Sequence, residues 1–236
     1  MTTRRSPILK RALRKYRLFR GSAALDGLDL ELAKFVDFEN GFFVEAGAND
    51  GINQSNSLYF ERHRGWTGLL VEPIPELAAR CRRNRPRCVV ENVALVPLWF
   101  RQPTIVMRYC NLMSVVKGSM KSEQEELAYI RNGCEIQRTT SYELTVPAAS
   151  LSSLLDRHHV ARVDLLSLDV EYYELNALRG LDFSRHRPTF MLIETHSREA
   201  LDSLLSPWYQ LVSQLSEHDL LYRVSVSTHA DCAGLG

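Results

Sequence analysis

The chain has 236 residues, of which 45% are hydrophobic and 24% are charged, as expected for a folded globular protein and not for a disordered one. Its formal net charge is +1, but eight of its 29 basic residues lie in the first 20 positions, which contain no acid. The rest of the chain therefore holds 21 basic against 28 acidic residues, which argues against a general nucleic-acid-binding surface on the folded body.

The first segment, residues 1–24, is predicted to be a basic arm. Leu9, Ala12, Leu13 and Tyr16 recur at helical spacing between basic residues, so a short basic amphipathic helix is expected. Such a helix either packs lightly on the domain or contacts an anionic membrane or a partner. No uninterrupted apolar core follows these charges, which argues against a secretory signal.

The cysteines favour a reducing compartment. Their number is odd, and they show neither a C-x-x-C pair nor the spacing of metal ligands. We therefore expect reduced thiols and a cytoplasmic location. No apolar stretch is long enough to span a bilayer. The five cysteines are Cys81, Cys88, Cys110, Cys134 and Cys232.

The first half of the chain alternates between helical and strand patterns. Such alternation is typical of parallel strands joined by right-handed helical crossovers. Pro75 suits the first turn of one helix, and Ser55 or Asn56 suits the cap of another. The predicted elements are a helix over 29–37, a strand over 42–46, a helix over 55–63, a strand over 67–71, a helix over 75–84 and a strand over 87–95.

The pattern is interrupted over about residues 97–143, which we interpret as an insertion over the active-site edge of a single domain spanning 25–236. Within it we expect a strand over 104–110 and a helix over 123–132. Regular order then returns with helices over 150–160, 173–181 and 198–205, and strands over 163–171, 187–196, 208–215 and 219–227.

Polar residues follow the predicted strands where each one ends. Ligands of a parallel α/β sheet bind beyond the carboxyl ends of its strands, near the point where the strand order reverses. Acids dominate this predicted edge, whereas a phosphate site would offer lysine or arginine beside glycine-rich amides. The residues are Glu45 with the loop Gly47–Gly51, Glu72, Glu91 with Asn92, Asp169 with Glu171, and Glu194 with Thr195 and His196.

The stretch "FFVEAGANDG" carries the most specific signal. Gly47 and Gly51 allow the backbone to approach a ligand closely. Glu72 follows Asp50 by 22 positions, at the end of the next strand, where an acid can accept both hydroxyls of an adenosine ribose. The pattern E-x-G-x-x-x-G differs from the dinucleotide pattern G-x-G-x-x-G. S-adenosylmethionine fits better, since acids such as Glu45 would complement its positive sulfonium and amino groups.

Three blocks, "FFVEAGANDGINQSNSLYFERHRGWTGLLVEP", "ENVAL" and "VDLLSLDVEYYELNALRGLD", make the chain resemble the FkbM-type methyltransferases. The resemblance implies a Rossmann-like class I methyltransferase fold: a mostly parallel seven-stranded sheet with helices on both faces and an antiparallel C-terminal strand. It also implies site residues. Glu45, Gly47, Asn49, Asp50 and Gly51 would line the methionine end of the cofactor, Glu72 would hold the ribose, Glu91 or Asn92 would lie near the adenine, and Asp169 and Glu171 would border the reacting methyl.

One position departs from the family pattern, because Tyr172 stands where a glycine is usual. A bulky side chain there would narrow the acceptor pocket, with a change of substrate choice or loss of activity as the two consequences. For the proton acceptor we name His196, Glu171 and Asp169 as catalytic candidates. No metal site is assigned, although Asp169, Glu171 and Glu194 leave a divalent cation as an alternative.

Three functions remain open from the sequence. The first is O-methylation of a hydroxyl on a sugar, glycolipid, polyketide or other small acceptor, with S-adenosylmethionine as cofactor. The second is a nicotinamide-dependent oxidoreductase on a similar sheet, which the missing third glycine disfavours. The third is a non-catalytic nucleoside-binding or membrane-associated module, suggested by Tyr172 and the basic arm. A small-molecule or glycan acceptor is expected as partner, and no nucleic acid.

Overall fold

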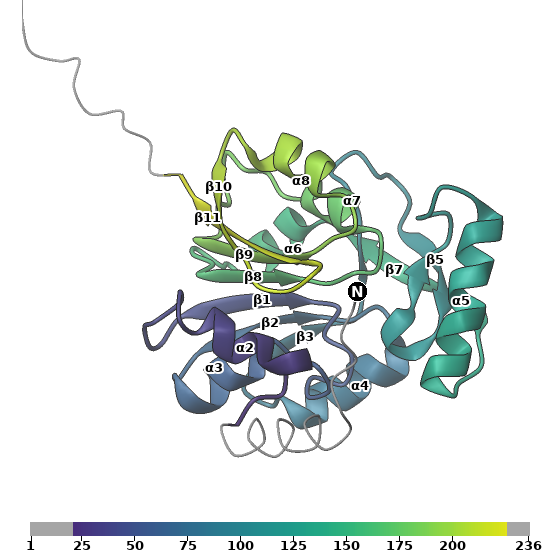
Figure 1. Cartoon of the computed structure of the whole chain (residues 1–236), viewed down its shortest axis with the longest axis horizontal. Coiled ribbons are helices and arrows are strands. Elements are labelled where there is room, and N and C mark those ends of the chain that lie inside the picture. The colour runs from purple at the N-terminus through teal and green to yellow at the C-terminus, as the bar shows by residue number, and fades with distance from the viewer. Residues whose placement is uncertain (1–20, 226–236) are drawn as a thin grey trace, which may run out of the picture.

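The strands and helices alternate along the chain and form one seven-stranded sheet with helices on both faces (Figure 1). The computed structural model describes residues 21–225, so the predicted basic helix around Leu9–Tyr16 and Cys232 lie outside the described residues. In spatial order the strands of this main sheet are β10 (Tyr209–Gln214), β11 (Asp219–Val224), β9 (Phe190–Glu194), β8 (Leu165–Leu168), β1 (Phe42–Ala46), β2 (Thr67–Val71) and β3 (Val89–Glu91).

The strand directions confirm the predicted fold class. β3, β2, β1, β8 and β9 pair in parallel, whereas β11 runs antiparallel to both β9 and β10. The chain runs outward from β1 to β2 and β3, and later returns to the other side of β1 with β8. β1 therefore marks the point where the strand order reverses, which is where ligands bind in such sheets.

Two apolar cores lie on the two faces of the main sheet. Because successive strand residues face opposite sides, Val44 and Ala46 of β1 pack in one core and Phe43 in the other. The first core includes α6 (Leu151–Arg157), α7 (Glu174–Leu178) and α8 (Arg198–Leu205). The second includes α2 (Leu28–Leu32), α3 (Leu58–His63) and α4 (Pro75–Asn84), with the 3-10 turn η1 (Leu25–Gly27) before α2.

A second, four-stranded sheet stands beside one end of the main sheet, together with the long helix α5 (Figure 1). Most of it lies in the predicted insertion. Its spatial order is β4 (Ala94–Leu95), β7 (Tyr142–Ala149), β5 (Thr104–Tyr109) and β6 (Val115–Val116). α5 spans Glu123–Gln137, and the short 3-10 turn η2 spans Asn111–Met113.

The second sheet corrects two details of the prediction. The single strand expected over 87–95 is two strands: β3 belongs to the main sheet and β4 pairs with β7. The break falls at Asn92, whose amide donates hydrogen bonds to the backbone carbonyls of 72–73 and turns the chain away from β3. β7 itself was not predicted, because most of its side chains are at least partly exposed and Pro147 weakens the strand pattern.

The helix expected over 55–63 begins only at Leu58, because Ser55, Asn56 and Ser57 are bound to Glu45. The four cysteines in the described part of the chain are free thiols. Among the helices of residues 21–225, each is too short or too polar to cross a membrane.

Candidate active site

The loop after β1 passes so close to the end of β8 that only glycine fits at its first turn. Gly47 has φ +85°, a left-handed conformation that other residues adopt at a cost. A Cβ at this position would lie 1.8 Å from the backbone oxygen of Asp169. Gly51 has φ +79° and packs instead on α4, where a Cβ would lie 2.8 Å from side-chain atoms of Cys81 and Arg85. The two glycines therefore serve different contacts.

The polar residues of this loop bind its own backbone. Asn49, with φ 49°, donates its backbone N–H to Oε2 of Glu72 at 2.8 Å, and its side-chain oxygen accepts the N–H of Asp50 at 2.8 Å. Oδ1 of Asp50 accepts the N–H groups of Ile52 and Asn53 at 2.9 and 2.8 Å. Asn49 and Asp50 thus fix the loop conformation and tie it to β2.

Glu45 points into the protein on the side of α3 and α4. Its carboxylate accepts hydrogen bonds from the Ser55 hydroxyl at 2.9 Å, the Asn56 N–H at 2.7 Å and the Ser57 hydroxyl at 2.5 Å. Nη1 of the fully buried Arg85 lies 3.8 Å from it. This carboxylate therefore connects β1 to the segment before α3.

A pocket lies between the carboxyl ends of β1, β2 and β8 and the second sheet. It is partly open to solvent, and its empty space, open solvent included, is about 520 Å³. Four of the predicted site residues line it: Gly47, Glu72, Asp169 and Glu171. The second sheet and the turns beside it contribute Met107, Asn111, Ser114 and Val116, none of which the sequence singled out.

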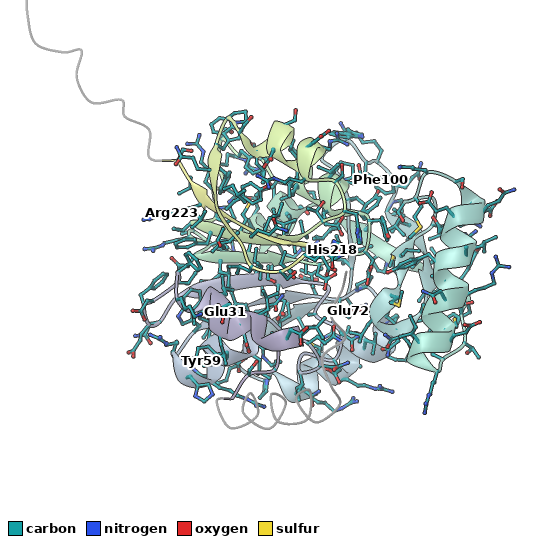
Figure 2. All side chains as sticks on the ribbon, in the orientation of Figure 1. Glu31, Tyr59, Glu72, Phe100, His218 and Arg223 are labelled. Carbon is teal, nitrogen blue, oxygen red and sulfur yellow. The ribbon has the colours of Figure 1, made fainter. Side chains whose placement is uncertain are left out.

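Glu72 lines this pocket and is buried. Figure 2 shows it at the end of the main sheet nearer to α5. Its two carboxylate oxygens accept the N–H groups of Asn49 and Ile74 at 2.8 and 2.9 Å. Burial raises the pKa of Glu72 to about 7. Each oxygen keeps a further lone pair, so the carboxylate can still accept hydrogen bonds from hydroxyl groups of a ligand.

Glu91 and Asn92 do not line the pocket. Glu91 accepts hydrogen bonds from Arg157 at 3.0 Å and His158 at 2.6 Å. Burial alone would raise the pKa of Glu91, but these two hydrogen bonds lower it. Asn92 holds the turn after β2 through the carbonyls of 72–73. Both residues therefore support the walls of the pocket from outside.

The acids that follow β8 have raised pKa values. Burial, the carboxyl groups of Glu194 and Glu171, and a hydrogen bond with Glu194 raise the pKa of Asp169 well above its ordinary range. Burial raises the pKa of Glu171 to about 8, although a hydrogen bond from Tyr129 opposes the shift. Burial also raises the pKa of Glu174 to about 7. Near neutral pH this cluster therefore holds protons that isolated carboxylates would have lost.

His196 lies to one side of the pocket and is exposed. Its ring stacks on Tyr172 with centroids 4.5 Å apart, and the ring of His218 lies 4.6 Å away. Burial, followed by the nearby His218, lowers the pKa of His196. Of the three catalytic candidates, Asp169 and Glu171 line the pocket and His196 does not.

Within residues 21–225 no group of three or more His, Cys, Asp or Glu side chains is arranged to hold a metal ion. The donors in the pocket fit an adenosyl sulfonium instead. Gly47 offers close backbone approach, Glu72 offers carboxyl oxygens that can accept hydrogen bonds from hydroxyl groups, and Asp169 offers a carboxyl group whose ionised form a positive ligand would stabilise.

Comparison with known families distinguishes a methyltransferase from the nicotinamide-dependent alternative. The family model described as the methyltransferase FkbM domain matches residues 45–224. The chain belongs to the FkbM methyltransferase family. It is therefore an S-adenosylmethionine-dependent methyltransferase with a Rossmann-like class I fold, and the nicotinamide-dependent alternative is set aside.

Several solved methyltransferase structures are similar to this FkbM methyltransferase at low identity. A TehB-like SAM-dependent methyltransferase from Corynebacterium glutamicum has 9% identity and a TM-score of 0.43, over 93% of this chain and 100% of the other. An RNA methyltransferase from Salinibacter ruber, in complex with S-adenosyl-L-homocysteine, has 11% identity and a TM-score of 0.42, over 89% of this chain and 97% of the other. A methyltransferase from Geobacter sulfurreducens has 13% identity and a TM-score of 0.44, over 95% of this chain and 93% of the other. None of the curated proteins compared matches the chain.

Proposed function

We propose that this FkbM methyltransferase methylates a hydroxyl group of a sugar, glycolipid, polyketide or other small acceptor, with Glu171 as general base. The observation that carries the proposal is the position of Glu171. It lies in the same pocket as Gly47 and Glu72, at the carboxyl end of the strand next to β1. In this proposal residues 25–236 act as one methyltransferase domain, and the insertion over 97–143 supplies the opposite wall.

The cofactor contacts divide between direct and supporting residues. Gly47 and Asp169 would lie against the methionine end, and Glu72 would accept the ribose hydroxyls. Apolar side chains from Val71 and from 93–95 line the same pocket and suit the adenine. In this proposal Glu45, Asn49, Asp50, Gly51, Glu91 and Asn92 hold these groups in place through the contacts described above.

When bound, S-adenosylmethionine supplies an electrophilic methyl group on a sulfonium. The chain must then align the acceptor hydroxyl with that methyl and remove its proton. Alignment alone can supply about 7 to 11 kcal/mol of acceleration, and a general base a further ~10²- to 10⁴-fold. A pKa near 8 makes Glu171 a strong enough base while a working fraction of it is ionised close to neutral pH.

The acceptor surface is acidic and aromatic. Glu171 and Glu194 lie beside Tyr172 and His196, a combination that suits hydroxyl-bearing rings through hydrogen bonds and stacking. Polyanionic nucleic acid would be repelled by the same carboxylates. The RNA specificity named for the Salinibacter ruber protein is therefore not carried over to this chain. Membrane contact through the basic arm remains a proposal about residues outside the described structure.

Calorimetric titration tests the cofactor half of the proposal. S-adenosylmethionine and S-adenosylhomocysteine should bind saturably, whereas NAD should give no comparable heat. Transfer of a labelled methyl group to a panel of glycosides and polyketide alcohols then tests the acceptor half. Glu171→Gln should lower the rate of transfer by about 10²- to 10⁴-fold with little change in cofactor affinity. The matched change Glu199→Gln, on the exposed face of α8, should leave both intact. Absence of binding by either sulfur nucleoside would contradict the proposal.

A further inference from the structure

Helix α5 places one side chain in contact with the active-site acids. The Tyr129 hydroxyl donates a hydrogen bond of 2.5 Å to Oε2 of Glu171, across 42 residues of sequence. The ring of Tyr129 also meets Tyr172 edge-on, with centroids 5.2 Å apart and planes at 82°. Tyr129 is half-buried, so this contact lies inside the site and not on the open surface.

The helix that carries Tyr129 is fixed by a buried ion pair. Nη1 of Arg108, on β5, lies 2.7 Å from Oε1 of Glu126 on α5, and both side chains are buried. Oε2 of Glu126 accepts the N–H groups of Gly118 and Ser119 at 2.7 and 3.1 Å. Tyr129 follows Glu126 by three positions and so projects from the same side of the helix. Its hydroxyl is therefore held at a defined place.

The partner of Tyr129 lies in a strained turn. Glu171 has φ 50° and the next residue, Tyr172, has φ 66°, so two consecutive non-glycine residues adopt the left-handed conformation. Such conformations persist where neighbouring contacts enforce them, and they cluster at functional sites. Here the stack of Tyr172 on His196 and the bond from Tyr129 to Glu171 hold the turn.

We propose that Tyr129 is a positioning residue for Glu171: its hydroxyl occupies Oε2 of Glu171 and thereby directs Oε1 of Glu171 to the acceptor hydroxyl. The proposal rests on the role of Glu171 as general base. As the new C–O bond forms, the acceptor proton moves to Oε1, and the C–S bond breaks with its electron pair remaining on sulfur. The hydrogen bond from Tyr129 does not take part in the transfer. It selects which oxygen is free and stabilises the ionised carboxylate.

Tyr129→Phe removes a single oxygen atom and leaves the ring in place, so thermal unfolding should change little. Because the hydrogen bond lowers the pKa of Glu171, its loss should move the acid limb of the kcat profile to higher pH. A displacement of about one pH unit would reduce kcat about tenfold at pH 7, with recovery at more alkaline pH. KM for S-adenosylmethionine should be unchanged. The matched control is Tyr142→Phe, whose ring is more exposed and stacks on Tyr109.

A second measurement needs no acceptor. Carboxyl ¹³C resonances of labelled glutamate can be followed against pH in the wild type and in Tyr129→Phe, with Glu171→Gln assigning the signal. The Glu171 midpoint should rise in Tyr129→Phe and not in Tyr142→Phe. An unmoved midpoint together with an unmoved acid limb would overturn the proposal even if the enzyme methylates a hydroxyl. Failure of cofactor binding would instead overturn the proposed function and leave the Tyr129 contact tested by the resonance alone.

Discussion

Arg85 links α4 to the loop after β1 and to the segment 55–57 that precedes α3. Replacing Arg85 by methionine tests how much this link contributes to stability. The side chain is fully buried at the end of α4 and forms an ion pair with Glu61. It also donates hydrogen bonds to the Gly51 carbonyl at 2.9 Å, the Ser55 hydroxyl at 3.1 Å and the Ser57 hydroxyl at 3.0 Å. Methionine keeps much of the apolar stem but none of these bonds.

The expected loss of stability follows from the charges left behind. Arg85→Met would leave Glu61 and Glu45 buried without their cation. Removing one partner of a buried ion pair typically costs about 3 to 5 kcal/mol. We therefore expect the free energy of unfolding to fall by about that amount. The remaining hydrogen bonds of Glu45 to residues 55–57 should keep the cost from rising further.

Urea denaturation followed by tryptophan fluorescence, to which the buried Trp66 contributes, measures this change. The control is Arg82→Met on the same helix, where the side chain is exposed and a change within about 0.5 kcal/mol is expected. S-adenosylhomocysteine should also bind Arg85→Met more weakly, because the Gly51 carbonyl loses its donor. If the free energy of unfolding falls by less than about 1 kcal/mol, the charge of Glu45 does not depend on Arg85. Glu45 would then again be a candidate for direct contact with the cofactor.

Three further predictions concern the pocket itself. Gly47→Ala should lower the melting temperature far more than Gly118→Ala, since both glycines have positive φ but only the first Cβ would meet a backbone oxygen; equal effects in calorimetric scans would contradict the close approach to Asp169. The pKa of Glu171 in the folded state, about 8, exceeds its ordinary value of 4.5, so its contribution to stability is complete below about pH 4.5 and is lost as pH rises through 8. Urea denaturation of Glu171→Gln between pH 5 and 8 should therefore show a flatter decline in stability than the wild type, and an unchanged slope would argue against that raised pKa. Tyr172→Gly should relieve the strain of a non-glycine residue in the left-handed conformation, but it also removes the ring stack on His196. Cofactor affinity should stay within about twofold by calorimetry, and the ranking of acceptors in the labelled-methyl assay should change. An unchanged ranking would show that Tyr172 does not contact the acceptor.

The fold was predictable because the alternation of strands and helices is a local property of the sequence. Each strand of the main sheet overlaps a predicted one, and α8 has the predicted bounds of 198–205. The second sheet was harder. β4 is two residues long and depends on a partner more than fifty positions away, and β7 lacks a clean apolar alternation. Their pairing is a long-range event that no local pattern encodes.

The same distinction applies to the candidate site. Gly47 and Glu72 could be found from spacing, because their positions relative to the ends of β1 and β2 are fixed by local chain geometry. Spacing cannot tell whether an acid faces a ligand or binds the backbone beside it. Asp50 caps a turn and Glu45 faces α3 and α4, although both stand next to the glycine loop. Tyr129 could not be predicted, because only the folded insertion brings α5 to the end of β8.

The acids at this sheet edge differ in the charges and hydrogen-bond donors that surround their carboxyl groups. Glu45 and Glu91 each have an arginine nearby and several hydrogen-bond donors, so their charge is balanced within the protein. Asp169 and Glu171 have mainly burial and other carboxyl groups around them, which raises their pKa values. A cationic ligand in the pocket would lower those pKa values by direct attraction. In the proposed mechanism, in which Glu171 is the general base, binding of the sulfonium cofactor and ionisation of Glu171 would therefore be linked, and the base would become competent once the methyl donor is bound.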